Sequence, residues 1–413
     1  MRPVTVLVLV GAVLVFGGIA FTTLGGTGAG TIDGELTERW ISDTPRNNTF
    51  NHHAVGAGDG LVVAPLAAVP GSGVEMTERS CSLVRLAPTD GGVDWQTTMP
   101  PEQCFTHALT QPAIGDIDGD SSPEISVGTT ADATIIYAAD GSEQARLPQS
   151  TYGYGQPTVG NVTAAPGPEL VSSDIGGTVT VASGDGTVHW QRNVSATVWA
   201  SPVVADVDAD DAPEVVVGAS DRTVAFDADG TIVWDVDVAG QDLRAGQADD
   251  DPAVELIGTS SAAERGIVAI DGRSGTIEWE YTVRGTPTVH SVADADGDGD
   301  TEVYFAKPGN VVGALNATAG DLEWTTRLAP EENTPTPAPV LGDLTGDGQR
   351  ELVTVTSSGT VTVLNPTSGE QLAVYERETP VWTFPTVADL TDDPGAEILV
   401  RYGDGRVAAL AYT

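Results

Sequence analysis

The chain has 413 residues and carries 59 acidic side chains against 18 lysines and arginines, a formal charge of −41, although only 19% of its residues are charged. Its 40% hydrophobic content is too high for a disordered polymer, so the acidity belongs to a chain that builds a core. Such a surface repels phosphates, which excludes non-specific nucleic-acid binding and disfavours attachment to anionic lipid headgroups. Acidity with a single lysine, Lys307, is typical of a halophilic organism, because concentrated salt screens the repulsion within about 3 Å at 1 M.

The first segment, residues 4–24, contains no charged side chain and follows Arg2. About twenty apolar residues in a helix span a hydrocarbon core of about 30 Å. An uncleaved anchor with a cytoplasmic N-terminus fits this length and Arg2 better than a signal peptide does, because the following GGTGAGT is a poor cleavage site. We therefore predict a signal-anchor or transmembrane helix over residues 1–30 and an extracellular domain over residues 31–413, with secretion after cleavage as the alternative.

Export agrees with the cysteine count. Cys81 and Cys104 are the only two cysteines, and an oxidising compartment allows them to form one disulfide. Two unpaired buried thiols are the alternative.

Internal repetition dominates the rest of the chain. One glutamate recurs every 41 to 49 residues, at Glu124, Glu169, Glu214, Glu255, Glu302, Glu351 and Glu397. Each unit, clearest over residues 200–238, alternates apolar and polar residues in four short runs separated by Asp, Gly and Pro turns, which is the pattern of a four-stranded propeller blade. An eighth unit covers residues 60–100, and the last unit, residues 384–413, supplies only three strands.

The missing strand lies at the other end of the chain. Residues 34–43 (GELTERWISD) resemble the outer strands of the other units, so the N-terminal strand is expected to complete the last blade and close the ring. We predict an all-β, eight-bladed β-propeller, with seven blades as the competing count.

The passage from third to fourth strand carries a family resemblance. Residues 269–279 (AIDGRSGTIEW) resemble the A-x-D-x-x-T-G-x-x-x-W docking motif of quinoprotein-like (PQQ-like repeat) propellers, which include outer-membrane assembly lipoproteins and quinone-dependent dehydrogenases. The resemblance implies that one tryptophan of each unit packs against the neighbouring blade: Trp95, Trp190, Trp234, Trp279 and Trp324. Ala145 and Ala373 depart from the pattern, so weaker junctions are expected there.

The acidic turns resemble the calcium loops of integrin-type FG-GAP repeats, with glutamate at the ninth position. Alternate carboxylates of a tight loop point inward and surround a hard cation such as Ca²⁺. Three loops are complete: Asp116, Asp118, Asp120 and Glu124; Asp206, Asp208, Asp210 and Glu214; Asp294, Asp296, Asp298 and Glu302. Three more are partial: Asp249, Asp251 and Glu255, after Gln247; Asp343, Asp347 and Glu351; Asp389, Asp393 and Glu397. Residues 161–169 lack the central acids and are expected to be metal-free.

Solvated Asp-rich turns in an acidic protein are the alternative to calcium, and the glutamate can serve packing alone. The fixed register of the acids favours calcium, in a structural role, because loops at one rim offer no open coordination site for catalysis.

The connections that lead into each blade are predicted to line the opposite face, near the central axis. Tyr154, Trp199, Arg284, Thr336 and Trp382 stand three residues before a proline in these connections, where they are candidates for binding a glycan or a peptide. Packing between neighbouring connections is the alternative.

The sequence contains no recognisable catalytic motif or transition-metal spacing, and the two cysteines are not adjacent as in quinone-dependent dehydrogenases, so PQQ is not expected. We therefore predict a non-enzymatic, calcium-binding, membrane-anchored propeller that binds a protein or glycan at the cell surface. A quinone-dependent dehydrogenase or a polysaccharide-acting enzyme is the alternative.

Overall fold

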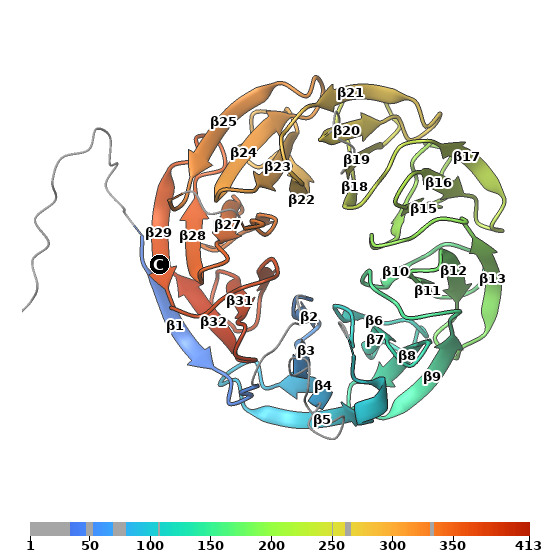
Figure 1. The fold of residues 1–413 in the computed structure, drawn as a ribbon, viewed down its shortest axis with the longest axis horizontal. Coiled ribbons are helices and arrows are strands. Elements are labelled where there is room, and N and C mark those ends of the chain that lie inside the picture. The colour runs from blue at the N-terminus through green and yellow to red at the C-terminus, as the bar shows by residue number, and fades with distance from the viewer. Residues whose placement is uncertain are drawn as a thin grey trace, which may run out of the picture. The chain divides into compact units, whose positions relative to one another are not determined.

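Eight four-stranded antiparallel sheets surround one axis in the computed structural model of the chain (Figure 1). The structure describes residues 34–46, 53–68, 80–105, 108–249, 251–260, 266–330 and 334–413. The predicted segment 1–30 lies outside these residues, and none of the described residues forms a helix long and apolar enough to cross a membrane. The eight four-stranded sheets confirm the predicted eight-bladed propeller.

Each blade runs from an inner strand at the axis to an outer strand at the circumference (Figure 1). Blade 1 contains β2 (Gly56–Gly58), β3 (Leu61–Ala68), β4 (Ser80–Leu86) and β5 (Val93–Met99). Blade 2 contains β6 (Ala113–Gly115), β7 (Glu124–Thr129), β8 (Ala133–Ala138) and β9 (Glu143–Pro148). Blade 3 contains β10 (Thr158–Gly160), β11 (Glu169–Ser173), β12 (Thr178–Ala182) and β13 (Val188–Asn193). Blade 4 contains β14 (Val203–Ala205), β15 (Glu214–Gly218), β16 (Thr223–Phe226) and β17 (Ile232–Val236).

The second half of the ring repeats this order. Blade 5 contains β18 (Leu243–Gly246), β19 (Glu255–Thr259), β20 (Ile267–Ile270) and β21 (Ile277–Tyr281). Blade 6 contains β22 (Thr288–Ala293), β23 (Glu302–Lys307), β24 (Val311–Asn316) and β25 (Leu322–Arg327). Blade 7 contains β26 (Val340–Gly342), β27 (Glu351–Val355), β28 (Thr360–Leu364) and β29 (Gln371–Glu376). Blade 8 contains β30 (Thr386–Ala388), β31 (Glu397–Arg401), β32 (Val407–Tyr412) and, as its outer strand, β1 (Leu36–Ile41).

The strand from the N-terminal side closes the ring as predicted. β1 pairs antiparallel with β32, with Leu36 opposite Tyr412 and Ile41 opposite Ala408. The sheet of blade 8 therefore has no unpaired outer edge on β32, which removes a template for aggregation.

Burial explains the strand sequences. The second and third strands are covered on both faces by neighbouring blades, so β15 (EVVVG) and β16 (TVAF) are buried along their whole length. In outer strands such as β21, side chains that are exposed to solvent alternate with side chains that are partly buried. Apolar clusters cross between blades, and one joins Val181 and Trp190 of blade 3 to Val215 and Phe226 of blade 4.

The docking tryptophans are confirmed as contacts between blades. In each case the indole Nε1–H of one blade donates to a carbonyl of the next, after that blade's third strand: Trp95 to Ala139 (2.9 Å), Trp190 to Ala228 (2.9 Å), Trp234 to Gly272 (2.7 Å), Trp279 to Ala317 (2.6 Å) and Trp324 to Pro366 (2.8 Å). Trp40 of β1 makes the same contact with Pro88 (2.7 Å), so a sixth junction uses the motif.

Two junctions lack an indole at this position. Ala145 pairs with Ile136, and Ala373 pairs with Val363, in the register that holds tryptophan elsewhere. The junction from blade 7 to blade 8 has a different contact beyond the end of β29: Arg377 bonds Asp404, in the turn between β31 and β32, at 2.6 Å and stacks 4.3 Å above the ring centre of Tyr402. That these junctions are weaker stays a prediction.

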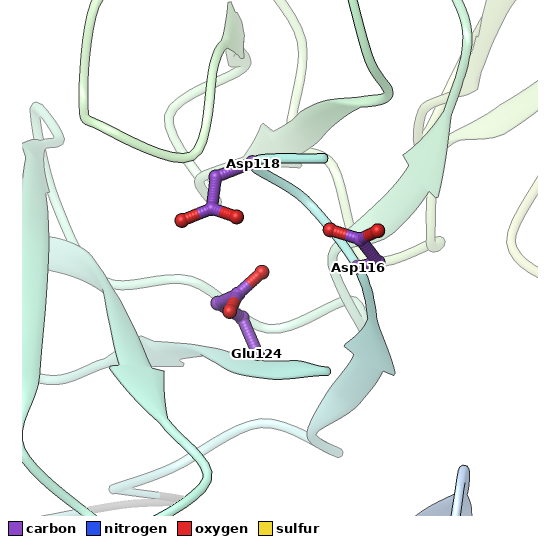
Figure 2. A group of neighbouring side chains, drawn as sticks. All are labelled: Asp116, Asp118 and Glu124. Atoms are coloured by element: carbon purple, nitrogen blue, oxygen red, sulfur yellow. The ribbon is translucent and has the colours of Figure 1, made fainter. Parts of the chain in front are cut away.

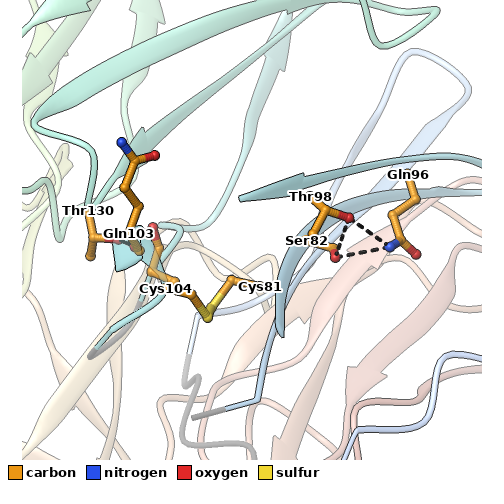
Figure 3. Close-up of a disulfide and its surroundings, with 8 residues drawn as sticks. Cys81, Ser82, Gln96, Thr98, Gln103, Cys104 and Thr130 are labelled. Carbon is orange, nitrogen blue, oxygen red and sulfur yellow. Dashed lines mark hydrogen bonds between the residues drawn. A yellow bond between two sulfur atoms is a disulfide. The ribbon is translucent and has the colours of Figure 1, made fainter. Parts of the chain in front are cut away.

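A disulfide joins Cys81 of β4 to Cys104, which follows the 3-10 helix η2 (Pro101–Gln103) (Figure 3). Both cysteines are fully buried. The bond ties the third strand of blade 1 to the connection that leads into blade 2, and the hydroxyl of Thr130 donates to the Gln103 carbonyl beside it. The sequence left open whether the two cysteines are bonded or are two buried thiols, and the structure has the disulfide.

Candidate functional sites

The recurring glutamate has one role in all seven loops. It is the first residue of the second strand, and its carboxylate accepts the backbone N–H of the residue seven positions earlier: Ile117, Val162, Val207, Ala248, Ala295, Leu344 and Leu390. Glu169 makes this bond although its loop has no central acids. The glutamate therefore holds the loop closed whether or not the other carboxylates are present, so its recurrence alone is no evidence for a cation.

The loop of blade 2 brings three carboxylates together (Figure 2). Oxygens of Asp116, Asp118 and Glu124 all lie within 4.8 Å of one another, and Asp120 falls outside this group. Asp116 accepts the N–H groups of Gly119 (2.7 Å) and Ser121 (3.0 Å), which fixes the bend of the loop. The loop is thus preformed by its own hydrogen bonds, as the solvated-turn alternative also requires.

Blades 4 and 6 hold similar groups. Asp206, Asp208 and Asp210 converge in blade 4 without Glu214, and Asp294, Asp296 and Glu302 converge in blade 6 without Asp298. Burial raises the pKa of Glu214, and of Glu302, to about 7, and the neighbouring aspartates add to the rise. Oδ1 of Asp208 is buried without a hydrogen-bond partner among the described residues. Carboxylate-only donor sets with such an unsatisfied oxygen fit a hard divalent cation.

The partial loops differ from one another. In blade 5, Asp249 and Glu255 form a group with Glu278 of the outer strand β21, a residue that the sequence reasoning missed. In the described parts of blades 7 and 8, Asp343, Asp347 and Glu351, and likewise Asp389, Asp393 and Glu397, form no such group. Blade 8 instead has the guanidinium of Arg39, with Nε 3.1 Å from Oε1 of Glu397 and an ion pair to Asp393.

The predicted ligand face separates into packed and exposed residues. The rings of Tyr154 and Trp199 meet edge to face at 4.9 Å, and His53 packs against Tyr154 at 5.0 Å. Burial raises the pKa of Tyr154 to about 12. Thr336 is buried and donates to the Lys307 carbonyl. These contacts match the packing alternative for three of the five residues.

Arg284 and Trp382 are exposed, and 49% of the surface of Trp382 is open to solvent. Near the axis, a hollow of about 280 Å³ lies among the inner strands of blades 1, 2, 3 and 8. Gln111, Gln156 and Thr386 line it beside apolar and backbone groups, and none of the lining residues titrates.

Parts of the chain match two known families. Residues 129–298 match the profile of the family described as outer membrane protein assembly factor BamB, and residues 294–354 match the FG-GAP-like repeat. Both resemblances expected from the sequence are therefore confirmed for these parts. The second match contains the acidic loops of blades 6 and 7. No curated protein matches the sequence.

Solved structures share the architecture. BamB from Moraxella catarrhalis is 16% identical, with a TM-score of 0.60 over 91% of this chain and 97% of that chain. BBS1N, crystallised in complex with ARL6DN, is 14% identical, with a TM-score of 0.54 over 73% and 91%. A rhamnogalacturonan lyase from Bacillus licheniformis is 16% identical, with a TM-score of 0.60 over 87% and 71%. At these identities the likeness shows the fold alone.

Proposed function

We propose that this chain is a non-enzymatic scaffold, exported and held at the cell surface by its N-terminal segment, that binds a protein or glycan partner. The match of residues 129–298 to the BamB family carries the proposal. BBS1N, a propeller of similar architecture, was solved in complex with a second protein. An outward negative charge of this size favours a partner with a basic or neutral contact surface over an acidic one.

The partner's contact is assigned to the face that carries the connections between blades. Trp382 and Arg284 present an aromatic ring and a guanidinium to solvent on this face. Exposed tryptophan and arginine are the residue types that dominate the energy of protein interfaces. Two further aromatic residues of these connections, Tyr154 and Trp199, pack on each other and provide a rigid floor.

Affinity capture from native membranes tests this assignment. Wild-type protein and Ile232→Ala should recover the same partner, because Ile232 is similarly exposed (54%) but lies on the outer strand β17. Trp382→Ala should reduce recovery about tenfold or more, since truncating a central aromatic costs about 2 kcal/mol. Equal recovery by Trp382→Ala and Ile232→Ala would contradict the assignment of the face.

Calcium belongs to the proposal as a structural ion. Asp116, Asp118 and Glu124 in blade 2, together with the corresponding groups of blades 4 and 6, would hold it. The unsatisfied Oδ1 of Asp208 and the raised pKa values of Glu214 and Glu302 support a missing positive charge at these loops. A bound cation would stiffen one rim of the ring and leave the opposite face free for the partner.

A polysaccharide-acting enzyme is the second candidate, favoured by the similar architecture of the rhamnogalacturonan lyase. Incubation with rhamnogalacturonan, followed by size-exclusion analysis of the polymer, distinguishes the two. The scaffold proposal expects no loss of polymer length at high protein concentration, and depolymerisation would replace it with the enzyme.

A further inference from the structure

In blades 3, 5 and 8 the side chain immediately before the docking tryptophan lies beside the recurring glutamate of its own blade. These side chains are His189, Glu278 and Arg39. The outer strand therefore contributes one side chain to a site otherwise built from the first-to-second turn, and the charge of this side chain differs from blade to blade.

In blades 3 and 8 the loop glutamate is fully satisfied. Oε1 of Glu397 accepts the hydroxyl of Thr391 at 2.9 Å and lies 3.1 Å from Nε of Arg39. In blade 3 the hydroxyl of Thr163 donates to Oε1 of Glu169, and Nε2 of His189 lies 4.0 Å away. The other oxygen takes the loop N–H in both blades. The protein itself thus supplies donors to these carboxylates.

In blade 5 the same position supplies a third carboxylate instead. Oxygens of Asp249, Glu255 and Glu278 lie within 4.8 Å of one another. Glu255 is 0% exposed, and while its Oε2 accepts the Ala248 N–H, its Oε1 is buried without a partner among the described residues. None of the three carboxylates forms an ion pair with a described basic side chain.

The first position of this loop explains why the charge comes from the strand. Gln247 stands where the complete loops have aspartate, and its Nε2 donates to the backbone carbonyls of Asp249 (2.9 Å) and Asp251. The amide shapes the loop but carries no charge. Glu278 restores the missing negative charge from the other side of the site.

These carboxylates repel one another unless a cation lies between them. Although most of Glu278 is open to solvent, partial desolvation of its carboxylate and the negative charges of Glu255, Asp249, Asp271 and Asp251 raise its pKa to about 7. Two oxygens that bind one calcium ion at about 2.3–2.6 Å are at most about 5 Å apart, which matches the separations in this group.

We propose that Asp249, Glu255 and Glu278 form a divalent-cation site in blade 5, completed by the outer strand. Oxygen-only donors without histidine or cysteine select a hard cation of the calcium class. The donor set of this site differs from those of the three complete loops, so it can bind a cation independently of them. Blade 8, in contrast, holds the guanidinium of Arg39 in place of a metal ion.

Calcium stoichiometry tests the site directly. The full chain is stripped with a chelator, dialysed, and titrated with CaCl₂ at constant ionic strength by equilibrium dialysis. Glu278→Gln should bind one calcium ion fewer per chain, or bind it about tenfold or more weakly, because affinity follows the number of charged ligands. Glu278 is exposed, so its amide variant is expected to fold, which circular dichroism checks.

Asp94→Asn is the matched control. Asp94 also precedes a docking tryptophan, but blade 1 has only a two-residue turn between β2 and β3 and no acidic loop. Its variant should retain the wild-type stoichiometry, and Asp249→Asn should reproduce the loss seen in Glu278→Gln. Wild-type stoichiometry and affinity in Glu278→Gln would overturn the proposal.

Terbium luminescence provides a second readout. Tb³⁺ replaces calcium at oxygen sites, and Trp279, next to Glu278, can sensitise it. The Tb³⁺ emission excited through tryptophan should fall in Glu278→Gln and stay unchanged in Asp94→Asn. Equal emission from both variants would contradict the site.

Discussion

Arg39 Nε and Glu397 Oε1 lie 3.1 Å apart, and this ion pair joins β1 to the loop of the blade that ends the chain. The carboxylate of Glu397 is 1% exposed, whereas the arginine side chain is 33% exposed. A buried carboxylate needs hydrogen-bond donors more than a partly exposed guanidinium needs acceptors. The ion pair therefore contributes to stability mainly because, without Arg39, the buried carboxylate of Glu397 would lose a donor.

Two substitutions of Arg39 test whether its positive charge takes the place of a cation in the loop of blade 8. Arg39→Gln should lower the free energy of unfolding by about 1 kcal/mol, since Glu397 keeps its bonds from Leu390 and Thr391. Arg39→Glu should be less stable than Arg39→Gln without calcium and gain more from added calcium than the wild type does, because it recreates the charge arrangement of blade 5. Calorimetric melting of the three proteins with and without calcium measures this. An Arg39→Glu protein whose calcium response equals that of the wild type would contradict it.

Removal of calcium should destabilise the wild type. A ligand present at 100 times its dissociation constant adds about 2.7 kcal/mol per site, so chelation should lower the Tm by several degrees at constant ionic strength. The combined variant Asp116→Asn, Asp206→Asn and Asp294→Asn should lose most of this response. If chelation leaves the wild-type Tm unchanged, the three complete loops are solvated turns.

The fold was readable from the sequence because every blade repeats the same physical requirements. The period of the glutamates marks the start of each second strand, and the tryptophans mark the outer strands, where they bond the next blade. The match between residues 34–43 and other outer strands predicted the closure that β1 makes with β32. Trp40 could have been added to the docking series from the same match.

The candidate sites were only partly readable. Aligning the loops by their acids compares only residues within one turn, so it finds Asp249 and Glu255. It misses Glu278, which lies on the outer strand and comes close to these two residues only through the pairing of the strands. It likewise misses Arg39, because the cation of blade 8 comes from the opposite end of the described chain. Tyr154 and Trp199 were predicted as candidates for ligand binding, with packing as the alternative, and their mutual packing depends on ring orientations that no spacing encodes.

Asp404 gives a pH-dependent contribution to the junction between blades 7 and 8. Burial raises its pKa, but hydrogen bonds from Arg377 and from the Arg406 N–H, with both positive charges, outweigh burial and lower the pKa below the ordinary 3.8. A carboxyl whose pKa is lowered by folding stabilises above its unfolded pKa, and this stabilisation is lost as the pH falls through the folded value. Asp404→Asn should therefore melt earlier than the wild type near neutral pH.

The deficit of Asp404→Asn should begin to shrink once the pH drops below 3.8. Melting temperatures of both proteins across this range measure it, in salt high enough to keep the acidic chain soluble. A deficit that stays constant, or grows, on acidification would assign the role of Asp404 to packing and not to its charge.

Gly320 allows the docking contact to be tested without touching a strand. It has φ +70°, and a β-carbon added there would lie 2.5 Å from Cε3 of Trp279. Gly320→Ala should therefore cost about 1–3 kcal/mol more than Gly60→Ala, which has φ +73° but no atom within 4 Å of the added carbon. In a Trp279→Ala background, which is itself less stable through loss of the bond to Ala317, the excess cost should vanish. Denaturant unfolding of the double-mutant cycle measures the coupling. Equal costs for the two glycines in the wild-type background would mean that the indole of Trp279 can move at no cost in stability. The docking contact would then not be tightly packed.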